Sequence, residues 1–255
     1  MSAAVAAKSM QTTFPSLKFV LMVGVGGGIP SQENDIRLSD IVVSLPNGQH
    51  GGVVQYDLGR METDGFDRLG TLNKPLKLLR TAVATLKATR NLGKDITGLI
   101  IGAIEKDEED EDEWTCPSKA QDILFQPMFT HIGNSPTCAL CAEKTGEIVP
   151  RTARKTQNPR IFYGNIASGN MVVKNAINRD KFAKLDNVIC FEMEAAGLMD
   201  DIPCLVIRGI SDYADSHKNW KWQPYAATVA AAYAKKLLPI VSPDFVDGMD
   251  LIKSK

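Results

Sequence analysis

The sequence has 255 residues, of which 44% are hydrophobic, and a formal net charge of −1 at pH 7. A chain of this size can bury a sizeable core as one α/β domain, and its charge gives no sign of a nucleic acid or an anionic membrane as partner. Its first residues lack the basic segment and apolar core of a secretory signal, and no apolar run reaches the roughly 18 residues of a membrane span. We therefore expect a cytoplasmic protein.

The five cysteines are an odd number, and two of them, Cys190 and Cys204, lie inside apolar, strand-like runs. Buried thiols in a reducing compartment fit this placement better than a disulfide framework. The C-x-x-C pair Cys138 and Cys141 could be half of a zinc site, with free thiols or a local disulfide as the alternatives. Further ligands for such a site are few, namely His131 and a distant Cys116. We expect no metal and no cofactor.

The first third of the chain predicts a helix from Ala3 to Phe14, followed by a buried strand over residues 17–25. This strand ends in a glycine-rich segment, GVGGG, before Pro30. Residues 41–45 and 53–58 read as two more strands, which a Gly-Gly turn could join as a hairpin. Apolar residues at helical spacing predict helices over residues 75–91, ending before Gly93, and 96–104.

The middle of the chain changes character at residues 105–113, EKDEEDEDE, which are too acidic to pack and predict a solvated loop. Residues 114–160 contain five prolines and predict a long irregular segment over the surface. We therefore expect one domain over residues 1–240, with an acidic loop and irregular insertion at 105–160, and a C-terminal tail at 241–255.

After the insertion, the sequence predicts strands over residues 161–168, 188–191 and 204–210. Helices are expected over residues 175–185 and 222–238, the second starting near Pro224. Strands that alternate with helices favour a three-layer α/β fold with a mostly parallel sheet.

Acidic residues follow two of these strands, which we expect to be neighbours. Glu192 and Glu194 follow residues 188–191, and Asp212 follows residues 204–210. Ligands of open α/β sheets bind outside the carboxyl ends of the strands, so these carboxylates are candidates for a site. The competing interpretation is a structural ion pair between Asp212 and either Arg208 or Lys218.

Alternation along an extended segment would place Phe191 and Met193 on one side and Glu192 and Glu194 on the other. An apolar shelf beside two acids suits a sugar that carries an aromatic base, since carboxylates accept strong hydrogen bonds from sugar hydroxyls. The glycine cluster is a weaker signal: it could let a ligand approach the backbone, or be a plain tight turn. Pro30 stands where a dinucleotide-binding helix would begin, which argues against that motif.

Several stretches together resemble the superfamily of purine nucleoside phosphorylases and 5′-methylthioadenosine/S-adenosylhomocysteine nucleosidases. The resemblance is closer still to fungal nucleoside-phosphorylase-like domains that are often joined to receptor-like ATPase or repeat modules. It covers most of the chain and rests on the stretches MVGVGGGIPSQENDIRLSDIVVS, GGVVQYDLGR, YGNIASGNMVVK, FEMEAAGLMDDIPCLVIRGISDYAD and ISDYADSHKNWKWQPYAA. It implies a three-layer α/β/α nucleoside phosphorylase-like fold with a central mixed sheet.

The resemblance also implies roles for individual residues. Glu194 would hold the ribose hydroxyls, with Met193 packed on the sugar and Glu192 and Phe191 nearby. Asp212 would be the general acid at purine N7. The remaining substrate-binding residues would be Ser211 as a partner of that acid, Gly26 and Gly27 beside the ribose or nucleophile, and Ser168, Gly169, Asn170 and Val172 around the base.

Three features depart from the family pattern. The chain begins at the helix before residues 17–25, so we expect the first strand and loop of the fold, with its acidic or phosphate-binding group, to be absent. Met22 and Val25 stand where phosphorylases carry an arginine and a hydroxyl, which argues against phosphorolysis. Val172 stands where bacterial nucleosidases stack an aromatic ring on the base. Asp57 and Glu33 are candidates to replace the missing acid.

The sequence thus predicts a nucleosidase that cleaves the N-glycosidic bond of a purine, most simply adenine, nucleoside or nucleotide by leaving-group protonation and attack of water. The alternatives are a phosphate-dependent phosphorylase and a catalytically weak nucleoside-binding or assembly module. A purine nucleoside or nucleotide is the expected ligand, and a homo-oligomer the expected assembly.

Overall fold

The computed structural model of the chain describes residues 3–63, 65–105, 114–202, 204–243, 246, 248 and 249. The predicted acidic loop lies outside these residues except for Glu105, and so does most of the predicted C-terminal tail.

All five predicted helices are confirmed, with small differences at their ends. The structure has α1 (Ala3–Thr13), α2 (Lys77–Lys87), α3 (Leu92–Ile104), α6 (Ala176–Asp186) and α7 (Gln223–Leu237). The prediction that Gly93 ends a helix is wrong, because Gly93 lies in the first turn of α3. The described part of the predicted insertion is irregular, as expected, and its regular pieces are short: α5 (Ala139–Ala142) and the 3-10 turns η1 (Lys119–Gln121) and η2 (Thr145–Glu147).

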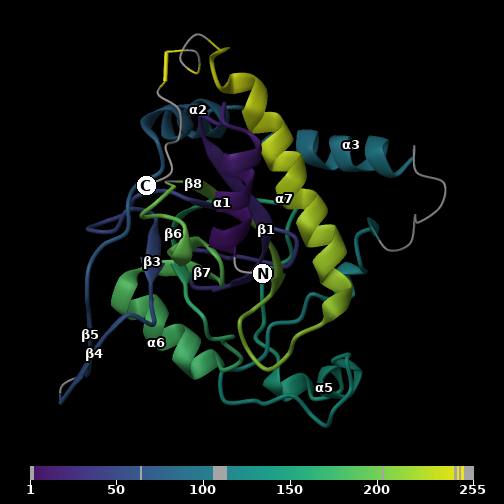
Figure 1. Ribbon diagram of the computed structural model, residues 1–255. Helices are drawn as coiled ribbons and strands as arrows, with labels where there is room; N and C mark the ends of the chain where they lie inside the picture. The colour runs from purple at the N-terminus through teal and green to yellow at the C-terminus, as the bar shows by residue number, and fades with distance from the viewer. Residues whose placement is uncertain are drawn as a thin grey trace.

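The strands also follow the prediction closely, with one addition. The main sheet contains β1 (Val20–Gly28), β2 (Ile41–Ser44), β3 (Val53–Gln55), β6 (Ile161–Ser168), β7 (Val188–Glu192) and β8 (Cys204–Asp212). The sequence analysis missed a small hairpin of β4 (Gly59–Glu62) and β5 (Gly65–Arg68). This hairpin extends from the body of the molecule beside α6 (Figure 1).

The main sheet is mixed and closes on itself. Its strands follow the order β2-β8-β1-β7-β6-β3, and β6 also pairs with β2. The pairs β1–β8, β2–β6, β3–β6 and β6–β7 are parallel, whereas β1–β7 and β2–β8 are antiparallel. Five strands therefore form a ring, and the predicted central mixed sheet is confirmed.

The predicted hairpin of residues 41–45 and 53–58 is wrong. Both strands run parallel to β6, β2 along its first half and β3 along its second. Two strands that are parallel to the same neighbour run in the same direction, so they cannot be the two arms of a hairpin. The chain between the two strands contains an isolated Asn47–His50 bridge. After it, β3 pairs with a later part of β6 than β2 does.

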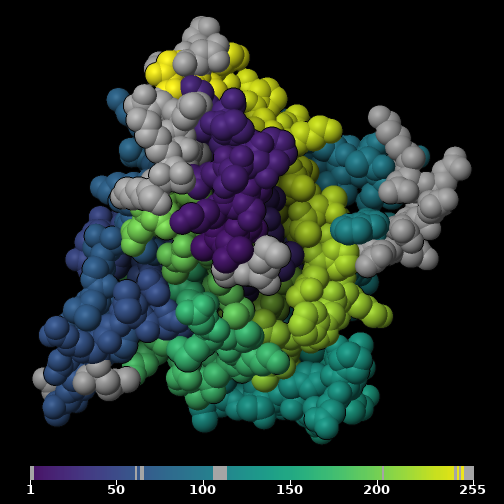
Figure 2. All heavy atoms as spheres, viewed as in Figure 1, coloured from purple at the N-terminus to yellow at the C-terminus, as the bar shows by residue number. Residues whose placement is uncertain are grey.

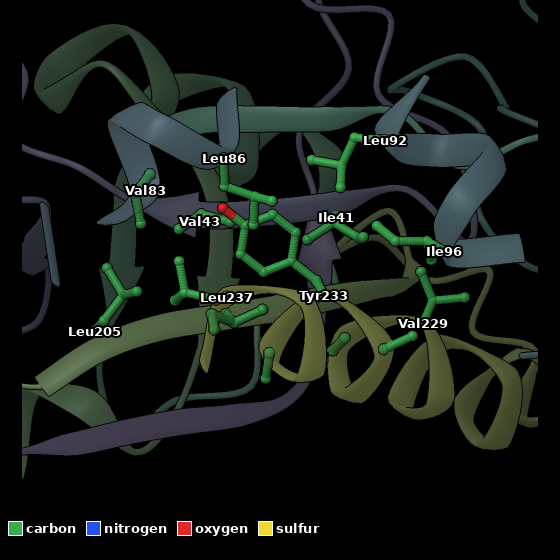
Figure 3. Close-up of a cluster of buried hydrophobic side chains, with 14 of the residues drawn as sticks. Ile41, Val43, Val83, Leu86, Leu92, Ile96, Leu205, Val229, Tyr233 and Leu237 are labelled. Atoms are coloured by element: carbon green, nitrogen blue, oxygen red, sulfur yellow. The ribbon is translucent and has the colours of Figure 1, made fainter. Parts of the chain in front are cut away.

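The core follows from alternation along the buried strands. Ile41 and Val43 of β2 point to α2, α3 and α7, while Val42 between them points into the ring. Figure 3 shows Tyr233 of α7 between side chains of β2 and those of α2 and α3. A third cluster packs α6 against the other side of the sheet through Phe182. The three layers are thus two helical layers with the strand ring between them.

The remaining helix, α1, lies on the outside of this body. It contains no buried residue, and Val5 and Met10 are each 52% exposed. Figure 2 shows it as a ridge across the front of the molecule. Among the described residues, no helix is both long and apolar enough to cross a membrane.

Candidate active site

The carboxyl ends of β1, β7 and β8 meet at one crossing. Gly27 of β1 is the register partner of Phe191 in β7 and also of Asp212 in β8. The prediction that β7 and β8 are neighbours is wrong, because β1 lies between them. The carboxylates at the ends of both strands are nevertheless brought together around β1, and this crossing is the candidate site.

The glycines of β1 make the crossing possible. A Cβ atom on Gly26 would lie 2.8 Å from Cys190 Sγ and 2.9 Å from the carbonyl oxygen of Phe191, and one on Gly27 would lie 2.9 Å from Asp212 Oδ1. Any larger residue would push the strands apart. The sequence predicted that the strand ends at residue 25, but Gly26 and Gly27 belong to β1. Residues of β7 and the side chain of Asp212 occupy the space where their side chains would be.

Two of the carboxylates converge on Arg208. Its Nη2 lies 2.5 Å from Glu192 Oε2 and 2.9 Å from Glu194 Oε2. Glu192 also accepts the backbone N–H groups of Glu194 and Ala195, each at 3.1 Å. The Glu192 side chain is fully buried, whereas that of Glu194 is 47% exposed. Of this pair, Glu194 is the carboxylate that a ligand can reach.

Glu192 is held by its surroundings as a structural group. Burial raises its pKa, and the Arg208 guanidinium and hydrogen bonds from Ser168 and the Glu194 N–H oppose that rise. Its carboxylate fixes the start of η3 (Ala195–Gly197), the turn that follows the site. The sequence predicts Glu192 among the substrate-binding residues; in the structure its carboxylate is buried against Arg208 Nη2.

Asp212 is held by three donors. Ser211 Oγ donates to its Oδ2 at 3.2 Å, the Ala214 N–H donates to Oδ1 at 2.9 Å, and Lys218 Nζ lies 3.2 Å from both oxygens. The residue is 7% exposed. Of the two predicted ion-pair partners Lys218 is confirmed, whereas Arg208 binds the glutamates instead.

The loop after β6 carries the residues predicted around the base. Ser168 is fully buried, and its Oγ accepts the backbone N–H of Ala196 at 2.8 Å. Asp57 Oδ2 accepts the Asn170 N–H at 2.7 Å, and Gly169 packs directly against Asp57. Asp57, a candidate for the missing acid, is therefore engaged in fixing this loop.

The same loop also lines a large cavity. The cavity has a volume of about 1050 Å³ and lies between the β4–β5 hairpin, residues 171–175 and α6. Neither Glu194 nor Asp212 lines it. The apolar and aromatic residues around it include Tyr56, Phe66, Met171, Val172 and Phe182. Val172 thus lines a cavity that neither of these two carboxylates lines.

The two apolar residues predicted beside the sugar differ in accessibility. Phe191 is 6% exposed and packs edge-on against Tyr56, with a ring distance of 5.3 Å. Met193 is 42% exposed. Because β7 ends at Glu192, the alternation that would align Phe191 with Met193 stops there. Met193 is the one that a ligand can contact.

Within the described part of the chain, the cysteines and His131 show no metal site. All five cysteines are free, with Cys190 and Cys204 fully buried as predicted, and burial raises the pKa of Cys204 to about 12. The ring nitrogens of His131 lie 3.3 and 3.1 Å from the carbonyl oxygens of Gly133 and Thr137. Among the described residues, no group of three or more His, Cys, Asp or Glu side chains could hold a metal ion.

The sequence analysis did not find the central role of Arg208. A signal was present, since an arginine in a continuous apolar strand must bury its charge and needs acidic partners. Asp212 is nearer to Arg208 in sequence than either glutamate, so spacing alone would have favoured the wrong partner. At this crossing the exposed carboxylate of Glu194 can accept hydrogen bonds from hydroxyl groups, and the carboxyl of Asp212 is buried nearby.

Comparison with solved structures identifies the class of fold. A 5′-methylthioadenosine/S-adenosylhomocysteine nucleosidase of Helicobacter pylori matches with a TM-score of 0.52 and 17% identity, over 93% of this chain and 74% of that one. Futalosine hydrolase of the same species matches with a TM-score of 0.52 and 18% identity, over 92% and 73%. The chain has the nucleoside phosphorylase-like α/β fold that these nucleosidases share.

Sequence relatives are larger proteins. A nucleotide-binding leucine-rich repeat (NLR)-like protein of Hyaloscypha variabilis is 57% identical over 94% of this chain, which spans 23% of that protein. An ATP nucleosidase of Escherichia coli is 36% identical over 72 residues, which are 26% of this chain and 14% of that protein. The chain thus spans less than a quarter of the length of each relative. No family model matches the sequence.

Proposed function

We propose that this chain is a purine nucleosidase domain that hydrolyses the N-glycosidic bond of an adenine nucleoside or nucleotide. The observation that carries the proposal is the β1 crossing, where the exposed carboxylate of Glu194 sits on Arg208 and the buried carboxyl of Asp212 sits beside Gly27. Two similarities support the same proposal: the fold is similar to that of nucleosidases, and part of the sequence matches an ATP nucleosidase.

In the proposed reaction, Glu194 accepts hydrogen bonds from the ribose hydroxyls and Met193 packs against the sugar. Asp212 donates a proton to N7 of the base as the bond from C1′ to the base breaks. Water adds to C1′ and releases a proton to the solvent, and Asp212 later regains one. Protonation removes the charge that would otherwise develop on the leaving base, and a general acid of this kind contributes about 10²–10⁴-fold to the rate.

Incubating the purified protein with adenosine, 5′-methylthioadenosine and ATP, each with and without phosphate, tests the proposal. We expect free adenine without phosphate, and ribose 1-phosphate would show phosphorolysis instead. Asp212→Asn should lower kcat by about 10²–10⁴-fold. Asp95→Asn, the same chemical change on the exposed surface of α3, is the matched control and should leave kcat unchanged. An Asp212→Asn variant with parental kcat would remove Asp212 from the mechanism.

A second candidate function is a nucleoside-binding module without turnover. The observation that favours it is the relative named as an NLR-like protein, of which this chain spans 23%. Calorimetry separates the two: saturable binding of adenosine or ATP with no adenine released would support the binding module. Released adenine would support the nucleosidase.

A further inference from the structure

His217 lies in an aromatic stack beside the candidate acid. Its ring is stacked on Phe125 at 4.1 Å and Phe129 at 5.3 Å between ring centroids, and both phenylalanines come from the insertion. Its Nδ1 lies 3.7 Å from Asp215 Oδ1. The side chain is 3% exposed, so the insertion closes over it and holds the ring in one orientation.

The other ring nitrogen of His217, Nε2, makes no hydrogen bond to the described residues. This nitrogen atom is also buried. Buried polar atoms in native proteins are nearly always hydrogen-bonded, so an unpaired one points to a bound water or ion.

A small cavity lies against this histidine. Its volume is about 20 Å³, and a single water needs roughly 10–15 Å³ of such space. His217 and Asp212 both line it, together with Ser211 and Asn219. A buried water requires about two to four hydrogen-bond partners, and the polar residues that line this cavity can provide them.

The carboxyl of Asp212 has room for one more hydrogen bond. Ser211, the Ala214 N–H and Lys218 occupy three positions around it. A carboxylate offers about four lone-pair sites. In the protonated acid the carboxyl also has an O–H to donate, and a water in the cavity that it shares with His217 can accept it.

We propose that one buried water joins His217 Nε2 to the carboxyl of Asp212, so that His217 is a positioning residue for the proton of the acid. The proposal rests on the proposed function, in which Asp212 protonates the leaving base. Ser216 Oγ lies 3.5 Å from Nδ1, and with the Nδ1–H donated to this hydroxyl, Nε2 accepts a hydrogen bond from the water. The water oxygen then accepts the O–H of Asp212, and the chain of bonds supports the protonated acid that catalysis requires.

The charged and titratable groups around His217 are Asp215, His131 at 5.6 Å between rings, Cys138 on the cavity wall, and the Asp212–Lys218 pair. Asp215 favours a proton on Nδ1, which leaves Nε2 as the acceptor. Lys218 offsets the charge of Asp212 and does not line the cavity. His131 is bonded within its own loop, which makes it a suitable control.

Nuclear magnetic resonance tests the link without any turnover. We expect the Nε2 signal of His217 to change in Asp212→Asn, because the variant removes the O–H donor at the other end of the water bridge. The ring signals of His131 should not change. A crystal structure should show a water within hydrogen-bond distance of both Nε2 and Asp212. An unchanged Nε2 signal of His217, or a cavity without water, would overturn the proposal even if the protein cleaves nucleosides.

Kinetics test the consequence. In His217→Phe, which keeps the aromatic stack, kcat should fall by about tenfold or more, part of the 10²–10⁴-fold of a general acid, with KM nearly unchanged. The basic limb of its pH profile should move to lower pH, because nothing then supports the protonated acid. His217→Gln should restore part of the rate, and His131→Gln should match the parent. A parental profile in His217→Phe would contradict the link, while absence of turnover in the parent would contradict the proposed function alone.

Discussion

Arg208 is the residue on which the arrangement of the site depends. Its guanidinium is 6% exposed and binds one fully buried and one exposed glutamate with the same Nη2 atom. A planar group with several N–H donors can hold two carboxylates at once, which the single ammonium of lysine does less well. Arg208 thereby positions Glu194 at the surface while it compensates the charge of Glu192.

Removing Arg208 should therefore destabilise the fold. In Arg208→Met the free energy of unfolding should fall by about 3–5 kcal/mol, because Glu192 is left as an unpaired buried charge. Glu194→Gln, which changes the exposed partner, should cost less than about 1 kcal/mol. Urea unfolding of both variants measures the difference, and equal small losses would show that Glu192 does not need its cation.

The loss in Arg208→Met should also depend on pH. Burial raises the pKa of Glu192, and the variant lacks the guanidinium that opposes this rise. A carboxyl whose pKa is higher in the folded than in the unfolded state destabilises the fold above the folded pKa, and the penalty disappears as the pH falls toward the unfolded value of about 4.3. The deficit relative to the parent should be larger at mildly alkaline than at mildly acidic pH.

At this scale the sequence predicted which residues lie close together better than how they pair. The acids after two buried strands, Glu194 and Asp212, lie at the crossing, and Ser211 bonds to Asp212. The burial of Glu192 and Phe191 and the water-sized cavity beside His217 were not predictable. They depend on β1 passing between two strands, and on an insertion with no periodic pattern, so the sequence carries no local sign of them.

Among the elements, α7 and β8 approach each other closely at Gly209. A Cβ atom on Gly209 of β8 would lie 1.8 Å from the carbonyl oxygen of Ala226 in α7. The helix can therefore lie against the strand only where the strand has no side chain. Gly93 of α3 is a second such position. A Cβ atom there would lie 2.3 Å from the carbonyl oxygen of Pro159.

Gly209→Ala should push α7 away from the sheet. We expect a loss of about 1–3 kcal/mol or more in the free energy of unfolding, as for overpacked cores. Gly98→Ala is the control: Gly98 lies in α3 with nothing within 4 Å of a Cβ position, and it should gain about 0.5–1 kcal/mol. Thermal or urea unfolding distinguishes the two, and a neutral Gly209→Ala would show that α7 can shift without cost.

The elements that the sequence predicted well are those with a clear period or a continuous apolar run, such as α2 and β8. The errors arose where a local signal competes with a distant contact. Gly93 looked like a helix stop, but it is a packing site for Pro159, and the Gly-Gly turn before β3 looked like a hairpin, but β6 pairs with both strands. Neither distant partner leaves a trace in the local sequence.

For the molecule as a whole, the closed ring implies one cooperative body. Each of its five strands is hydrogen-bonded on two sides, and β8 is buried along its full length. The helices α2, α3 and α7 complete that body by packing on the outer face of β2 and β8. In contrast, α1 lies outside it and buries no residue.

Hydrogen exchange should separate these two parts. Amides of α1 can exchange when α1 alone opens, because opening it uncovers little apolar surface, whereas those of β8 and α7 need the ring to unfold. We therefore expect α1 to exchange at least about 10³-fold faster than β8, a difference of about 4 kcal/mol in opening free energy. Mass spectrometry on peptic fragments measures both. The β4–β5 hairpin, which also extends from the body, is an internal comparison (Figure 1). Equal protection of α1 and β8 would mean that α1 is an integral part of the cooperative fold.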